Sequence, residues 1–301
     1  MKKIPIIIDT DPGIDDAAAI GLATHCEELD IKLITTVTGN VDINKTTENA
    51  LKLLTFFDKD IPVARGMETP LLQPVYGSEV HGESGMDGFD FKASTHSVIK
   101  EHAVEAIRQL LENHDEKITI VPIGPLTNIA MLLLLYPKLK SKIDKIVLMG
   151  GSLSGGNMNG PAEFNIWADP HAAKIVFESE IDVIMIGLDV TNQALIGEEE
   201  LSAAIKRGNK TAEMFNAIFQ HYRDGDMENG VVMHDSCAIA YLLNPEMFTV
   251  ERKHVKVVTS GPASGMTMEM FEELETNVSV ATDIDSALFQ EWFITILDKM
   301  L

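Results

Sequence analysis

Short runs of apolar residues alternate along this chain with longer segments whose apolar residues recur at helical spacing. Five runs predict buried strands: Ile4–Ile8, Ile31–Val37, Ile118–Val121, Lys145–Met149 and Asp182–Ile186. The segments around them predict helices, at Asp15–Ala23, Lys45–Phe57, Val98–Glu112, Leu126–Leu135 and Pro170–Ser179. Apolar strands separated by helices indicate a parallel sheet that helices cover on both faces.

The last third of the chain follows a different pattern. It is predicted to be mostly helical up to about Leu243 and to return to strands near His254–Thr259 and Asn277–Ala281. We find no linker, repeat or low-complexity tract. The sequence therefore predicts that residues 1–301 form a single α/β domain, built on an open, mostly parallel sheet of the Rossmann-like kind.

Unusual polar residues and glycines recur where the predicted strands end. They are Asp9 and Asp11, Gly39-Asn40, Gly124-Pro125 and Gly150-Gly151. In open parallel sheets the ligand crevice lies beyond the carboxyl ends of the strands. Two long irregular stretches, Gly66–Thr95 and Gly150–Asn165, also have the length typical of functional loops. We therefore expect the active site at this edge of the sheet.

An acidic cluster follows the first strand, with the sequence Asp9-Thr10-Asp11-Pro12-Gly13-Ile14-Asp15-Asp16. Asp9 and Asp11 are two apart on extended backbone and point to the same side. Asp15 and Asp16 start a helix, where the helix dipole favours negative charge. That position explains two acids without a metal, but it leaves the two strand acids unexplained. A cation would relieve the repulsion, and oxygen ligands suit calcium or magnesium. We expect a divalent-metal site, for calcium, that activates a water for hydrolysis.

Charge and composition exclude several classes of partner. The chain carries 24 basic and 46 acidic side chains, a formal net charge of −22, which disfavours nucleic acid or an anionic membrane as partner. Cys26 and Cys237 show no metal-binding spacing and fit apolar helices. The N-terminus lacks the apolar region of a signal peptide, and the longest apolar run, Ile129–Tyr136, is too short to span a bilayer. We expect a cytoplasmic enzyme.

The segment Asp9–Ala17 (DTDPGIDDA) resembles the N-terminal motif of the inosine-uridine-preferring nucleoside hydrolases. Further landmarks of that family follow in the expected order, at Thr36–Asn40, Gly124–Ala130, Met149–Ser152, Ala162–Pro170 and His234-Asp235. Within the family, three segments are most similar to the bacterial non-specific ribonucleoside hydrolases: Val80–Met86, Gly187–Gln193 and His221–Met227. The resemblance implies calcium-dependent hydrolysis of purine and pyrimidine ribonucleosides to ribose and free base. It also implies a homo-oligomer, a tetramer or dimer.

The resemblance also implies roles for single residues. The calcium ligands would be Asp11, Asp16, Asp235 and the backbone carbonyl of Ile123. Asp11 would also act as general base, and His234 as the general acid, which protonates the leaving base or polarises it by a hydrogen bond. Asp9 is left as a support for these groups.

Other residues would hold the nucleoside. Asp15 and Asn165 are expected at the ribose hydroxyls, with Asn40 near the same end, and Asn157 and Glu163 at the 5′-hydroxyl. Tyr222 would stack on the base, and His81 would line the pocket near the base or the 5′ end. Asp235 would contact the sugar as well as the metal. The chain departs from the family pattern at Gly160-Pro161, where the local turn changes although Asn157 keeps its spacing before Glu163.

Two other functions remain open at this stage. A magnesium-dependent phosphatase with a D-x-D motif could use Asp9 or Asp11 as nucleophile, but there the second Asp precedes Gly-Thr or Gly-Val, whereas Pro12-Gly13 follows here. A non-catalytic nucleoside-binding protein could keep the metal site. The presence of both Asp11 and His234 favours the enzyme over that alternative.

Overall fold

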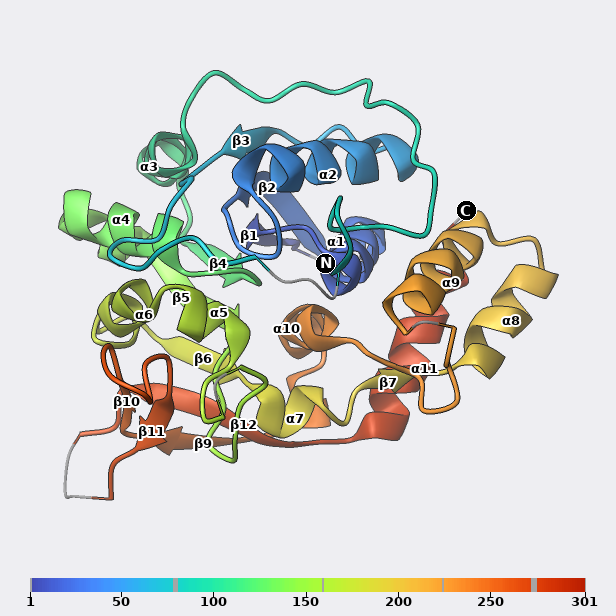
Figure 1. Ribbon diagram of the computed structural model, residues 1–301. Coiled ribbons are helices and arrows are strands. Elements are labelled where there is room, and N and C mark those ends of the chain that lie inside the picture. The colour runs from blue at the N-terminus through green and yellow to red at the C-terminus, as the bar shows by residue number, and fades with distance from the viewer. Residues whose placement is uncertain (1, 78–80, 159, 224, 272–274, 301) are drawn as a thin grey trace.

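An eight-stranded sheet forms the centre of the computed structural model, which describes residues 2–77, 81–158, 160–223, 225–271 and 275–300. The strand order is β3-β2-β1-β4-β5-β6-β12-β9 (Figure 1). The strands are β1 (Ile4–Thr10), β2 (Leu29–Thr36), β3 (Val63–Arg65), β4 (Ile118–Pro122), β5 (Ile143–Met149), β6 (Val183–Ile186), β9 (Phe248–Lys253) and β12 (Val278–Ile284). Every neighbouring pair is parallel except β12 and β9, which confirms the predicted mostly parallel sheet.

The strand order reverses at β1. From β1 the chain builds β2 and β3 on one side of it, then crosses to β4, β5 and β6 on the other. Asp9 of β1 pairs in register with Pro122 of β4, and the amide of Ile123 donates to the carbonyl of Asp9 at 2.8 Å. A crevice opens at such a reversal, beyond the carboxyl ends of the strands. The acidic cluster thus starts at the point where this topology favours a ligand site.

Helices cover both faces of the sheet (Figure 1). The α-helices are α1 (Ile14–His25), α2 (Ile43–Phe56), α3 (Ala103–Asn113), α4 (Thr127–Leu135), α5 (Phe164–Ala168), α6 (Pro170–Phe177), α7 (Leu188–Thr191), α8 (Glu198–Lys206), α9 (Lys210–Tyr222), α10 (His234–Leu243) and α11 (Ser286–Leu297). Ile6 and Ile8 of β1 join the core beneath α1, α10 and α11, whereas Ile7 joins the core beneath α3, α4 and α6. Alternate side chains of one strand are therefore buried in two cores, one on each face of the sheet. This explains the uninterrupted apolar runs.

Several elements differ from the sequence prediction. The strand expected near His254–Thr259 is β10 (Val255–Val257), which pairs with β11 (Thr267–Glu269) outside the main sheet. A second small ladder joins β7 (Leu195–Ile196) to β8 (Val231–Val232). The helix expected from Val98 begins only at Ala103, after the N-cap His102. Short 3₁₀ helices lie at Pro137–Lys142 and Pro245–Met247.

Among the strands of the main sheet and the longer helices, three were not predicted from the sequence: β3, β9 and α11. Strand β3 has three residues, and β9 is a partly exposed edge strand without a continuous apolar run. The described part of the long stretch Gly66–Thr95 forms no α-helix or β-strand, as expected of a loop. No helix in the described ranges is both long and apolar enough to cross a membrane. Cys26 and Cys237 are buried free thiols, as predicted.

Candidate active site

The loop between β1 and α1 folds tightly around its own carboxylates. The hydroxyl of Thr10 donates to Asp16 Oδ1 at 2.5 Å, and the amide of Gly13 donates to Asp16 Oδ2 at 2.9 Å. A Cβ atom at Gly13 would lie 2.8 Å from Asn40 Nδ2 and 2.9 Å from His81 Nδ1. Glycine therefore allows the end of β2 and the His81 loop to close against the start of α1.

Asp11 lies between two glycines that follow neighbouring strands. Its Oδ2 accepts a hydrogen bond from the amide of Asn40 at 2.7 Å. A Cβ atom added at Gly39 would lie 2.0 Å from Asp11 Oδ2, and one added at Gly124 would lie 2.3 Å from Asp11 Oδ1. Asp11 Oδ1 is buried and has no hydrogen-bond partner among the described residues. Such an orphaned carboxylate oxygen is costly unless it has a ligand.

Three further carboxylates meet beside Asp11. The oxygens of Asp15, Asp16 and Asp235 all lie within 4.8 Å of one another, with Asp235 supplied by the first turn of α10. Burial raises the pKa of Asp235 well above its usual range, and the charges of Asp15 and Asp16 raise it further. Burial and then the charge of Asp16 do the same to the pKa of Asp11. Burial raises the pKa of Asp16 to about 6.

This arrangement fits a hard divalent cation. The donors are carboxylates, and the backbone of Ile123 lines the adjoining pocket beside Asp235. Calcium and magnesium take oxygen ligands of this mixed kind. Of the four ligands expected from the sequence, Asp16 and Asp235 belong to the cluster, Asp11 adjoins it and Ile123 reaches its edge. Asp15, expected at the sugar alone, lies inside the cluster as well.

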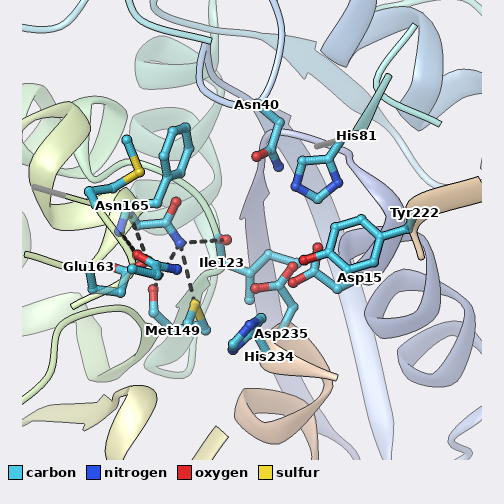
Figure 2. Close-up of a pocket in the computed structure, with 13 residues that line it drawn as sticks. Asp15, Asn40, His81, Ile123, Met149, Glu163, Asn165, Tyr222, His234 and Asp235 are labelled. Atoms are coloured by element: carbon cyan, nitrogen blue, oxygen red, sulfur yellow. Dashed lines mark hydrogen bonds between the residues drawn. The ribbon is translucent and has the colours of Figure 1, made fainter. Parts of the chain in front are cut away.

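A cavity of about 200 Å³ opens above the carboxylates (Figure 2). Its walls include every residue expected to bind substrate, together with Ile123 and His234: Asp15, Asn40, His81, Asn157, Glu163, Asn165, Tyr222 and Asp235. Asp11 and Asp16 do not line it and are buried below. Three lining residues were not singled out from the sequence, namely Met149, Met158 and Phe164. In a sequence, these apolar residues resemble core residues. Only the neighbouring motif residues indicated that this part of the chain belongs to the site.

Glu163 and Asn165 form one wall of this pocket. Glu163 is the N-cap of α5, and its carboxylate accepts from the amides of Gly151 and Asn165, both at 2.9 Å, and of Ile166 at 3.1 Å. Burial raises the pKa of Glu163 to about 7. Asn165 Nδ2 donates to the carbonyls of Ile123 and Met149 at 3.1 and 3.2 Å. These bonds fix Asn165 between the ends of β4 and β5.

Asn157 lies at the exposed rim of the pocket. Its Oδ1 accepts a hydrogen bond from the amide of Phe164 at 3.0 Å. The altered turn next to it includes Asn159, which lies outside the described residues. Asn157 nonetheless lines the pocket, although the neighbouring sequence departs from the family pattern.

Two histidines and a tyrosine complete the opposite wall (Figure 2). His81 Nδ1 accepts from the amide of Ile14 at 3.2 Å, and burial lowers the pKa of His81 to about 4. The rings of His81 and Tyr222 lie 5.6 Å apart between centroids. His234 Nδ1 is hydrogen-bonded to the hydroxyl of Thr191 at 2.7 Å, and burial lowers the pKa of His234 although Asp15 opposes this. No role was predicted for Thr191, although it lies within the segment Gly187–Gln193 that carries part of the family resemblance.

Asp9 is buried and does not line the pocket. Its Oδ1 accepts from the hydroxyl of Thr35 and from Asn128 Nδ2, the latter at 2.8 Å. Asn128 also donates to the carbonyl of Thr36 at 3.0 Å and accepts from the amide of Met67 at 2.9 Å. Asn128 thus ties β1, β2 and the loop after β3 together.

Comparison with known proteins identifies close relatives over the whole length. The family described as inosine-uridine preferring nucleoside hydrolase matches residues 6–291. The chain is 49% identical over 297 residues to the non-specific ribonucleoside hydrolase RihC of Salmonella agona, with 96% of each chain covered. It is 48% identical over 295 residues to RihC of Klebsiella pneumoniae, covering 96% of this chain and 97% of that one.

Solved structures agree with this similarity. The purine-preferring ribonucleoside hydrolase from Gardnerella vaginalis superposes with a TM-score of 0.92 at 30% identity, covering 98% of each chain. An inosine-guanosine nucleoside hydrolase superposes with a TM-score of 0.91 at 30% identity, covering 99% of each. The entire architecture, including the strand reversal at the acidic cluster, is therefore shared with enzymes of this kind.

Proposed function

Because the chain belongs to the inosine-uridine preferring nucleoside hydrolase family, we propose that it hydrolyses purine and pyrimidine ribonucleosides with a calcium ion bound at the acidic cluster. It is a ribonucleoside hydrolase, an enzyme that breaks N-glycosidic bonds. The observation that carries the finer proposal is the meeting of Asp15, Asp16 and Asp235 beside the orphaned oxygen of Asp11. The phosphatase alternative is not carried forward, because the chain belongs to a different family.

The ion would be held by Asp11, Asp16, Asp235 and the carbonyl of Ile123. When bound, calcium lowers the pKa of a water and binds the ribose diol. Calcium is favoured over magnesium because it accepts six to eight oxygens in irregular geometry, which suits a mixture of buried carboxylates and one carbonyl.

Asp11 and His234 would move the protons of the reaction. Asp11 takes a proton from water as the water oxygen bonds to C1′. The C1′–N bond breaks, its electron pair goes to the base, and His234 gives that base nitrogen a proton. Positive charge builds on the sugar in between, and the surrounding carboxylates stabilise it. The carboxylates that form the cluster would thus also favour the transition state.

The sugar would be gripped through its diol by Asp15 and Asn165, with Asn40 at the same end. We expect 2′-deoxyuridine to be hydrolysed roughly 10- to 150-fold more slowly than uridine, the value of a hydrogen bond to a charged group. Ribose or deoxyribose release, measured as reducing sugar, gives the comparison. Equal rates would contradict this placement of the sugar.

Glu163 and Asn157 would contact the 5′-hydroxyl. Since Glu163 is held among three backbone amides at the pocket wall, a 5′-phosphate there would meet a carboxylate and little space. We expect uridine 5′-monophosphate to be hydrolysed at least about tenfold more slowly than uridine. Release of uracil from each compound, followed by chromatography, tests this, and equal release would place the 5′ end elsewhere.

The decisive experiment is a panel of ribonucleosides with the calcium-loaded enzyme. Release of ribose from both uridine and inosine is expected. Intact nucleosides after long incubation would overturn the proposal, and tight binding without turnover would favour the nucleoside-binding alternative.

We also propose that residues 1–301 form one domain that assembles as a homo-oligomer, a tetramer or dimer, in the cytoplasm. Light scattering of the purified protein measures the assembly.

A further inference from the structure

The ring of His234 has one nitrogen inside the protein and one available to the pocket. Nδ1 lies 2.7 Å from the hydroxyl oxygen of Thr191, whose side chain is completely buried. The ring lines the pocket beside Asp235 (Figure 2). With Nδ1 engaged, Nε2 is the nitrogen left for a ligand. Because Nδ1 faces Thr191, this contact sets which nitrogen of His234 can meet substrate.

Thr191 is itself held firmly, at the end of the single turn α7. The amide of Leu188 donates to the carbonyl of Gly151 at 2.9 Å, and a Cβ atom at Gly187 would come within 2.6 Å of that oxygen. The carboxylate of Asp189 accepts from the amide of Leu153 at 2.9 Å. These contacts fix α7 to the loop that follows β5, on the same side of the sheet as the pocket.

The short ladder of β7 and β8 brings Thr191 and His234 together. It pairs Leu195 with Val232, and the amide of Met233 donates to the carbonyl of Ala194 at 2.8 Å. The ladder therefore joins the chain just after Thr191 to the chain just before His234. The β-branched side chain of Thr191 also has few χ1 rotamers. The direction of its hydroxyl is therefore restricted, as well as its position.

We propose that Thr191 is a positioning residue, whose hydroxyl holds the His234 ring with Nε2 directed at the leaving base. The inference rests on the proposed function, in which His234 protonates that base. In this step the Nε2–H bond breaks, and the proton joins the base nitrogen, which keeps the electron pair of the broken C1′–N bond. The ring becomes neutral and keeps its Nδ1–H, which donates a hydrogen bond to Thr191 Oγ1.

A hydroxyl suits this task better than a carboxylate. It can donate or accept, so it pairs with Nδ1 in either tautomer of the neutral ring and in the protonated ring. A carboxylate could only accept, and it would add negative charge next to Asp15 and Asp235. Thr191 therefore keeps the ring orientation throughout the proton transfer without adding to the repulsion in the cluster.

The test compares two substrates that differ in their need for an acid. Inosine has a poor leaving group, whereas p-nitrophenyl β-D-ribofuranoside releases an anion that is stable without a proton. We expect Thr191→Val, which keeps the shape of the side chain, to lower kcat for inosine about 10- to 100-fold with little change in KM. For the nitrophenyl riboside the loss should stay below about threefold. Thr191→Ser, which restores the hydroxyl, should recover most of the inosine activity.

Matched variants separate positioning from folding. Thr249→Val removes an exposed hydroxyl from β9, away from the pocket, and should leave both activities as they are. If Thr191→Val fails to give a normal thermal unfolding transition, Thr191→Ala is measured by the same ratio of substrates. In a His234→Ala background, adding Thr191→Val should cost no further inosine activity, because coupled residues are not additive.

Each outcome of these experiments either supports or overturns the role proposed for Thr191. A loss confined to inosine and rescued by serine supports the inference. An equal loss on both substrates, an unaffected inosine rate, or an additive effect in the His234→Ala background overturns it while the hydrolase stands. Inactivity of the unmodified enzyme towards both substrates would instead overturn the proposed function, so the two failures are distinguishable.

Discussion

Asp11→Asn is expected to lower kcat/KM for uridine by about 10³-fold, the scale of losing a general base. Asparagine has nearly the same shape and can still accept from the amide of Asn40, which donates to Asp11 Oδ2 at 2.7 Å. What it removes is the negative charge and the proton acceptor at Oδ1, the oxygen for which the described residues supply no hydrogen-bond partner. Steady-state ribose release over a range of uridine concentrations measures the effect.

The matched control for Asp11→Asn is the same substitution at an exposed position. Asp144 lies exposed near the start of β5, far along the strand from its carboxyl end. Asp144→Asn should keep full activity. If Asp11→Asn retained more than about a tenth of the activity with a normal fold, Asp11 could not be the base, and the proton acceptor would have to be sought among Asp15, Asp16 and Asp235.

Removal of the divalent ion is expected to abolish ribose release and to destabilise the protein in a pH-dependent way. Without the ion, burial raises the pKa of Asp16 to about 6, and that of Asp9 and of Glu163 to about 7, from ordinary values of 3.8 for Asp and 4.5 for Glu. The folded state then holds more protons than the unfolded state between about pH 4 and 7. Stability is therefore highest below the unfolded pKa and falls as the pH rises through the folded pKa values.

The melting temperature measures this contrast. Protein freed of metal by dialysis against a chelator should melt roughly 5 °C or more lower at pH 8 than at pH 5, since each kcal/mol shifts Tm by a few degrees in a chain of this size. Calcium added back at pH 8 should restore both Tm and activity. Asp16→Asn, which cannot ionise at that position, should show a smaller fall. A metal-free protein that melts alike at both pH values and stays active would contradict the proposed site.

The local pattern of residues predicted the central sheet and, within the site, the acidic loop after the first strand. The apolar runs identified five of the eight main strands nearly correctly, because a strand buried on both faces leaves a continuous signal. The acids of the first loop were legible for a similar reason, since carboxylates so close in sequence must lie close in space. The edge strand β9 was missed because a partly exposed strand lacks that signal. Helix α11 was not predicted, although its buried Phe289, Phe293 and Leu297 recur at helical spacing.

By itself, then, the sequence determined that a parallel sheet exists and that an acidic loop, predicted to bind a metal, lies at the end of its first strand. The distant groups Ile123 and Asp235 were expected from the family resemblance alone, and only the tertiary structure shows how they reach that loop. Strand order brings the carbonyl of Ile123 beside β1, α10 delivers Asp235 to Asp15 and Asp16, and the β7·β8 ladder sets Thr191 against His234. The physical reason is that side-chain alternation and helix periodicity are local, whereas these meetings depend on long-range strand pairing and close packing.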